Sequence, residues 1–104
     1  MKQILPAELA AWLADAGREP PQLLDVREPW EFEAARIAGA KLIPMREMPQ
    51  RAGELDPARA VVAICHHGGR SQQVALFLEK NGFAQVHNLA GGVDAWSRSV
   101  DPTA

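Results

Sequence analysis

The sequence predicts an α/β domain built on a parallel β-sheet of five strands with helices on both faces. Short apolar segments alternate with segments of helical spacing along the 104 residues. Because strands that are separated by helices over short distances are joined by right-handed crossovers, the sheet is expected to be parallel and covered on both sides. Residues 60–64 are all apolar without alternation, which is typical of a strand buried on both faces.

Five segments have the composition of strands. Branched or apolar residues bounded by glycine, proline or polar residues distinguish them from the helical segments. The strands are predicted at residues 3–5, 22–26, 41–43, 60–64 and 84–89, the first of them at an edge of the sheet.

Helical segments fill the intervals between these strands. Pro6 and Pro29 are well placed to start helices, since proline is favoured in a first helical turn. Residues 45–55 form a short helix or an irregular connection interrupted by Pro49. Further helices are predicted from Ser71 to the left-handed stop at Asn81-Gly82 and from Val93 onward, after a turn at Gly91-Gly92.

Composition excludes several classes of protein. Hydrophobic residues make up 47% of the chain and charged residues 23%, as in a globular protein. The net charge of -2, without a basic run, argues against nucleic-acid binding. No segment reaches the roughly 20 apolar residues that cross a membrane, so we expect a cytoplasmic protein. We expect one domain over residues 1–104, with a polar tail at 101–104.

The only cysteine, Cys65, directly follows the most apolar strand. A free cysteine is most often a buried structural residue. Here two glycines, an arginine and a predicted helix start follow it, and N–H groups at a helix N-terminus stabilise thiolates and bound anions. We therefore interpret Cys65 as a nucleophile in an anion-binding loop that consists of Cys65, His66, His67, Gly68, Gly69, Arg70 and Ser71.

The side chains of this loop have alternative interpretations. Arg70 is predicted to hold an anionic substrate, and the alternative is an exposed residue of the first helical turn, where the helix dipole disfavours a cation. Ser71 is predicted to cap the helix, with donation to the sulfur as a further role. His66 and His67 are candidates for acid–base or metal chemistry. Since adjacent histidines on a turn should point in different directions and zinc usually needs four ligands, neither a metal nor a cofactor is predicted.

A second set of polar residues ends the strand at residues 22–26, and ligands of such folds bind at the carboxyl ends of the strands. Asp25, Arg27 and Glu28 are interpreted as a charged network that holds the rim loops, with an acid–base set as the alternative. Trp30 is predicted to edge the pocket. His87 is interpreted as a structural histidine with satisfied hydrogen bonds.

Four sequence stretches, taken together and in this order, form a highly specific motif pattern, although each stretch alone is weak evidence. They are residues 24–32 (LDVREPWEF), residues 36–40 (RIAGA) leading to Ile43-Pro44, the loop of residues 65–71, and residues 88–96 (NLAGGVDAW). Together they resemble the rhodanese-like sulfurtransferase family in its single-domain form, over nearly all of the chain. The resemblance implies a three-layer α/β sandwich around a five-stranded parallel sheet, in agreement with the predicted elements.

The resemblance also implies an activity. A cysteine takes sulfane sulfur from a small anionic donor such as thiosulfate, becomes a persulfide, and passes the sulfur to an acceptor such as cyanide or a thiol. By position, Cys65 is the sulfur carrier, the backbone of residues 66–71 cradles the persulfide, and Arg70 helps to bind thiosulfate. Asp25 and Arg27 support the rim. Arg36 stands where relatives often have histidine, which alters the charge of the rim.

Two other functions are compatible with the sequence. One is a module that delivers persulfide sulfur to a dedicated partner protein, and the single cysteine requires an external acceptor in either case. The other is a phosphatase or arsenate reductase. Related dual-specificity phosphatases have one residue more between cysteine and arginine than the four residues found here, and the shorter loop favours sulfur over a phosphoryl group.

Overall fold

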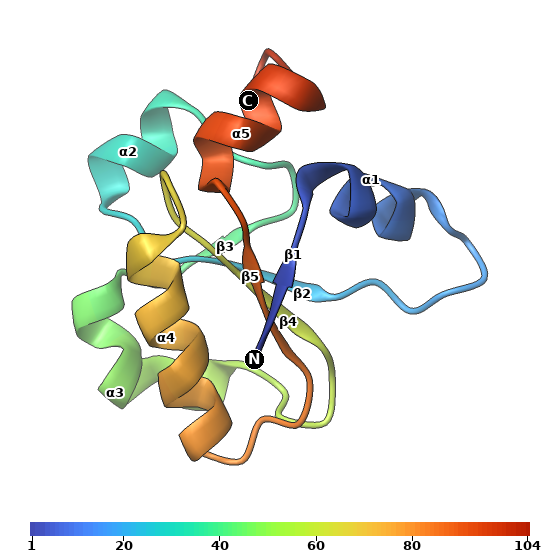
Figure 1. Cartoon of the computed structure of the whole chain (residues 1–104). Helices are drawn as coiled ribbons and strands as arrows, with labels where there is room; N and C mark the ends of the chain where they lie inside the picture. Colours follow the sequence, from blue (N-terminus) through green and yellow to red (C-terminus); the bar gives the residue numbers. More distant parts are fainter.

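The computed structural model describes residues 1–104 and contains a parallel sheet of five strands (Figure 1). The strand order is β1-β5-β4-β2-β3, and every neighbouring pair is parallel. The predicted fold class is therefore confirmed, with strand ends shifted by one or two residues. The strands are Lys2–Ile4 (β1), Gln22–Asp25 (β2), Lys41–Leu42 (β3), Val61–Ile64 (β4) and Val86–Leu89 (β5).

Helices cover both faces of the sheet (Figure 1). One face packs against α1 and α5, and the other against α3 and α4. Two 3₁₀ turns, η1 and η2, flank α3. The helical segments are Pro6–Ala14 (α1), Pro29–Ala34 (α2), Met45–Glu47 (η1), Met48–Arg51 (α3), Ala52–Glu54 (η2), Gly69–Lys80 (α4) and Gly92–Ser99 (α5).

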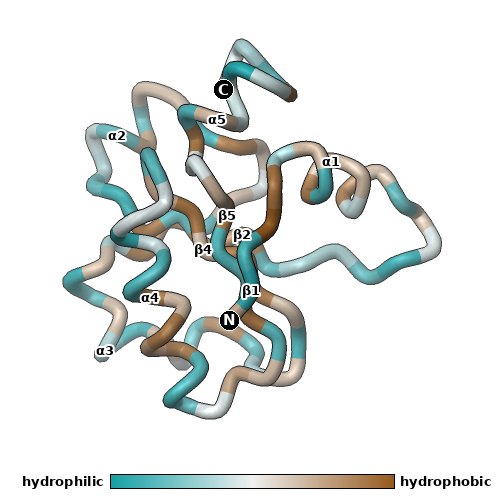
Figure 2. Tube along the Cα trace, in the orientation of Figure 1, coloured by the Kyte–Doolittle hydropathy of each residue, from teal (hydrophilic) through white to brown (hydrophobic).

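The two faces of β4 enter two separate hydrophobic clusters. Val61, Ala63 and Cys65 belong to the cluster that includes α4, whereas Val62 and Ile64 belong to the cluster with α1 and α5. All five residues are at most 1% exposed, as expected for a strand buried on both faces. In Figure 2 the trace of α4 changes between hydrophobic and hydrophilic segments along its turns, which is typical of a helix that covers a core.

One expectation about the connecting segments is corrected. Pro49 does not interrupt the segment of residues 45–55; it lies in the first turn of α3, where its missing N–H costs no hydrogen bond. The tail at residues 101–104 folds back on α5, and the backbone oxygen of Ala104 accepts a hydrogen bond from Ser97 Oγ at 3.3 Å. No helix has the length and apolar character required to span a bilayer.

Candidate active site around Cys65

Cys65 lies at the carboxyl end of β4, and its sulfur is the centre of a small hydrogen-bonded cluster. The Gly68 N–H donates to Sγ at 3.1 Å, and Ser71 Oγ lies 3.2 Å from the same atom. The residue is only 1% exposed. An N–H and a hydroxyl aimed at one sulfur, at the start of a helix of twelve residues, stabilise negative charge on that sulfur.

The first turn of α5 holds the other side of the loop. The N–H groups of Val93 and Asp94 donate to the carbonyl oxygens of Cys65 and His66 at 2.9 and 3.1 Å. Since the C=O and N–H of a trans peptide point in opposite directions, these bonds turn the N–H groups of His66 and His67 away from α5. Gly92 makes the close approach possible, because a Cβ at this position would lie 2.2 Å from the Cys65 oxygen.

The predicted helix cap at Ser71 is wrong. The cap is Gly68, whose φ of 104° lies in the left-handed region that favours glycine, and α4 begins at Gly69. Ser71 is therefore the third residue of the helix and is fully buried. Its hydroxyl faces the sulfur of Cys65 and Asn88 Oδ1, so the further role in hydrogen bonding to the sulfur agrees with the geometry.

Asn88 in β5 is a polar residue of the site for which no individual role was predicted. Its side chain is 2% exposed, and its Nδ2 donates to the backbone oxygen of Gly68 and to Gln3 Oε1, each at 3.0 Å. Its sequence signal is that it begins the fourth of the specific stretches, residues 88–96. Its place beside the loop follows from the pairing of β5 with β4.

Asp25 and Arg27 form a buried ion pair at the end of β2. Arg27 Nη2 lies 2.8 Å from Asp25 Oδ2 and also donates to the backbone oxygen of Ala35, the residue after α2, at 2.6 Å. Both side chains are at most 4% exposed. This pair ties the β2 end to α2, as the network interpretation requires. Glu28 is not part of it, because its carboxylate pairs with Arg46 in η1.

Arg70 is paired with Glu31 from α2 rather than left free. Its two terminal nitrogens donate to the two carboxylate oxygens of Glu31, both at 2.8 Å. The hydrogen bond from Arg70 lowers the pKa of Glu31 from 4.5 to about 2. Glu31 thus compensates the cation that the helix dipole disfavours, and it also raises the pKa of Arg70.

This ion pair predicts a stability difference that depends on pH. Because the folded-state pKa of Glu31 is depressed to about 2 from 4.5, the pair stabilises the protein above pH 4.5 and loses its contribution as pH falls toward 2. Urea unfolding of the wild type and of Glu31→Gln should show a lower free energy of unfolding for the variant at neutral pH, and a difference that vanishes near pH 2.

The matched control is Glu33→Gln, which removes the same charge from an exposed position of α2 that makes no ion pair. Its free energy of unfolding should differ little from that of the wild type, both at neutral pH and near pH 2. A Glu31→Gln difference that stays constant between neutral pH and pH 2 would contradict the assigned ion pair.

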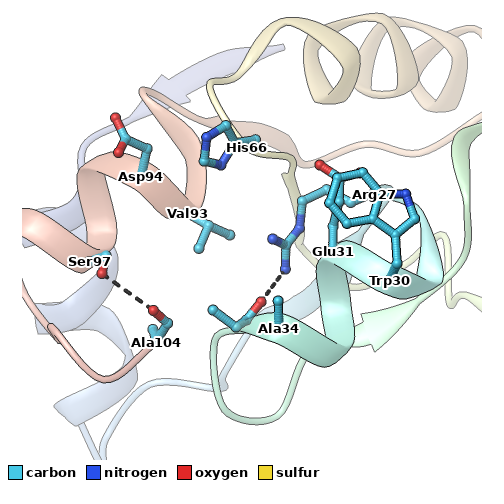
Figure 3. Close-up of a pocket in the computed structure, with 10 residues that line it drawn as sticks. Arg27, Trp30, Glu31, Ala34, His66, Val93, Asp94, Ser97 and Ala104 are labelled. Atoms are coloured by element: carbon cyan, nitrogen blue, oxygen red, sulfur yellow. Dashed lines mark hydrogen bonds between the residues drawn. The ribbon is translucent and has the colours of Figure 1, made fainter.

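A pocket of about 320 Å³ opens beside the loop, between α2 and α5. Figure 3 shows Trp30 on the α2 side, Val93 and Ser97 on the α5 side, and the hydrogen bond from Arg27 to the backbone. Trp30 is 71% exposed and lines the pocket, which agrees with its predicted place at the edge. The lining residues are Arg27, Trp30, Glu31, Ala34, Ala35, His66, Val93, Asp94, Ser97 and Ala104.

The expectation that His66 and His67 point in different directions is wrong. Their exposed rings contact each other, with centroids 4.1 Å apart and planes at 58°. His66 lines the pocket, whereas His67 Nδ1 lies 3.6 Å from Asp94 Oδ2. No three His, Cys, Asp or Glu side chains come together as a possible metal site.

His87 lies outside this cluster and packs edge-on against Trp12, with ring centroids 5.4 Å apart. The interpretation as a satisfied histidine is only partly right, because Nδ1 is buried without a hydrogen-bond partner. Burial lowers the pKa of His87, which favours the neutral ring.

Comparison with known proteins places these features in a family context. The family model described as "Rhodanese-like domain" matches residues 5–99. A sulfurtransferase of Allochromatium vinosum is 37% identical over 98 residues, with 94% of this chain and 90% of that protein covered. The crystal structure of a rhodanese-related protein from Thermoplasma volcanium superposes with a TM-score of 0.88 at 28% identity, covering 100% of this chain and 98% of the other.

A larger relative contains the same kind of domain. The chain is 39% identical over 108 residues to "Rhodanese-like/PpiC domain-containing protein 12, chloroplastic" of Arabidopsis thaliana, with 99% of this chain covered. It spans only 36% of the length of that protein.

Proposed function

The chain belongs to the rhodanese-like family, and on this premise we propose that it is a sulfurtransferase in which Cys65 carries sulfane sulfur from an anionic donor to a nucleophilic acceptor. The observation that carries the proposal is the sulfur of Cys65, held by the Gly68 N–H at 3.1 Å with Ser71 Oγ at 3.2 Å. The sulfurtransferase from Allochromatium vinosum supports the same reaction class.

The first half-reaction loads the cysteine. With thiosulfate as donor, the Cys65 thiolate attacks the outer sulfur and its electron pair forms the new S–S bond. The bond between the outer sulfur and the sulfonate group breaks, and sulfite leaves with the electron pair of that broken bond. The product is a persulfide anion, whose charge the N–H groups at the start of α4 stabilise.

The second half-reaction unloads it. Cyanide or a thiolate attacks the outer sulfur of the persulfide, and Cys65 leaves as a thiolate with the electron pair of the broken bond. The Gly68 N–H and the Ser71 hydroxyl are placed to stabilise that thiolate. No oxidant, reductant or metal is required, because the sulfane sulfur passes from one nucleophile (sulfite) to Cys65 and then to another (cyanide or a thiolate) without net oxidation or reduction.

Arg70 has a more restricted role than a free cation would have. Its two donor contacts with Glu31 leave the pair without net charge, and its side chain is 39% exposed. In this proposal Arg70 anchors α4 to α2 beside the sulfur and contributes to donor binding through its remaining N–H groups. Asp25 and Arg27 hold the pocket wall.

Delivery to a protein acceptor is the second candidate. Trp30 is a large side chain, 71% exposed, at the edge of the pocket, and exposed aromatic residues of this kind are enriched at interfaces. The fusion of a similar domain to further sequence in the Arabidopsis relative is compatible with such a role.

Mass spectrometry of the intact protein tests the proposal without the physiological substrate. Incubation with thiosulfate should add the mass of one sulfur atom at Cys65, and cyanide should remove it with formation of thiocyanate. An adduct that small acceptors leave in place would favour delivery to a dedicated partner. If no adduct forms and the protein hydrolyses an aryl phosphate, phosphatase activity would replace sulfur transfer as the proposed function.

A further inference from the structure

The Ser71 hydroxyl lies between two acceptors but has only one hydrogen to donate. Its oxygen is 3.2 Å from Cys65 Sγ and 2.5 Å from Asn88 Oδ1. When Cys65 is a thiol, its S–H can donate to the Ser71 oxygen while the Ser71 hydrogen goes to Asn88. When Cys65 is a thiolate, the sulfur and Asn88 compete for the same hydrogen.

The orientation of the Asn88 amide follows from its neighbours. The atom that faces the Gly68 carbonyl oxygen must be the NH₂ group, because a carbonyl only accepts. The second hydrogen of this group goes to Gln3 Oε1. Oδ1 is therefore the atom that faces Ser71, and the amide, 2% exposed, cannot flip without losing both donations.

The two half-reactions make opposite demands on the Ser71 hydrogen. A thiolate that accepts a hydrogen bond is a weaker nucleophile and a better leaving group, because both properties follow its basicity. Loading is fastest when the hydrogen stays on the Asn88 side. Unloading is fastest when the hydrogen turns to the sulfur as Cys65 departs.

We propose that Asn88 is a positioning residue that competes with the Cys65 sulfur for the Ser71 hydrogen, and so keeps the thiolate nucleophilic during loading while leaving the hydrogen free to assist unloading. This role rests on the proposed sulfur transfer. The Gly68 peptide remains held without Asn88, since its oxygen also accepts the Gln72 N–H at 3.2 Å.

The test uses Asn88→Leu and Ser71→Ala in the full chain. In Asn88→Leu the Ser71 hydrogen has only the sulfur as partner, and in Ser71→Ala there is no hydrogen. We expect the pH midpoint of iodoacetamide alkylation to fall in Asn88→Leu and to rise in Ser71→Ala, each by about half to one pH unit. These opposite directions would not result from a loop that is merely loosened in both variants.

Single-turnover measurements with thiosulfate and cyanide separate the half-reactions. In Asn88→Leu, loading should slow by about threefold to tenfold at saturating pH while unloading is unchanged or faster. In Ser71→Ala, unloading should slow more than loading. Asn81→Leu, the same substitution at the exposed end of α4, should change neither rate.

Asn88→Asp is the second variant if Asn88→Leu does not fold. Its carboxylate holds the Ser71 hydrogen more strongly, so the alkylation midpoint should rise instead of fall. Midpoints that move in the same direction in Asn88→Leu and Ser71→Ala, or an Asp variant that alkylates like the wild type, would overturn the proposal. Because alkylation needs no sulfur donor, these results remain distinct from a failure of wild-type persulfide formation, which would overturn sulfur transfer itself.

Discussion

Cys65→Ser is expected to abolish transfer of sulfur from thiosulfate to cyanide, by about three orders of magnitude or more in kcat/KM. The serine hydroxyl is not ionised near neutral pH and is a poor nucleophile toward sulfur, so no persulfide forms. The protein should nevertheless fold, because serine has nearly the same shape and Gly68 and Ser71 remain as hydrogen-bond partners. Thiocyanate formation measures sulfur transfer, the mass shift measures persulfide formation, and circular dichroism shows whether the protein folds.

A relocated thiol is the matched control for this result. Ser99 is exposed at the end of α5, so Cys65→Ser combined with Ser99→Cys retains one cysteine away from the loop. Activity should not return, because the new sulfur lacks the N–H groups at the start of α4. Full activity of Cys65→Ser would show that sulfur transfer does not pass through Cys65, and full activity of the double variant alone would show that the loop is not needed.

Gly92→Ala is expected to cause the largest loss of stability among the proposed substitutions outside the loop, with a loss of sulfur transfer. A Cβ at this position would lie 2.2 Å from the Cys65 oxygen and 2.4 Å from the His66 oxygen, both of them backbone atoms. The backbone φ of 61° adds strain of about 1 kcal/mol for a residue other than glycine. Relief of the clash requires α5 to move away from the loop, which breaks the bonds from Val93 and Asp94.

Chemical denaturation should show a loss of about 3 kcal/mol or more for Gly92→Ala, and sulfur transfer should fall with it. Gly82→Ala isolates the backbone strain, since Gly82 has a φ of 92° but nothing within 4 Å of an added Cβ. It should lose only about 1 to 2 kcal/mol and keep its transfer rate. Equal losses in both variants would mean that the approach of α5 to the loop contributes nothing specific.

Local chemistry made much of this protein predictable. The uninterrupted apolar run of β4 indicated a strand buried on both faces, and the cysteine that follows it had to lie at the carboxyl end of that strand. The stop at Asn81-Gly82 was also correct, since Gly82 has the left-handed conformation that ends α4. These features depend on residues close together in the chain.

Contacts between residues far apart in the sequence could not be predicted in the same way. Ser71 had every property of a helix cap, yet Gly68 takes that place and Ser71 turns to Asn88, which is 17 residues away. Arg70 was expected to hold an anionic substrate, and no ion pair was predicted for it because its partner Glu31 is 39 residues away. Neither pairing has a local signal, since each depends on which strands and helices become neighbours.

The sequence by itself therefore determined the family, the parallel α/β fold, the place of the single cysteine and the loop that surrounds it, because each of these depends on short-range patterns. Only the tertiary structure decided how the charge of Arg70 is compensated, which carbonyls α5 holds, and which side-chain oxygen lies beside the Ser71 hydroxyl. Hydrogen bonds and ion pairs act over a few ångströms, and the packing of β5, α2 and α5 around the end of β4 is what brings these partners within that range.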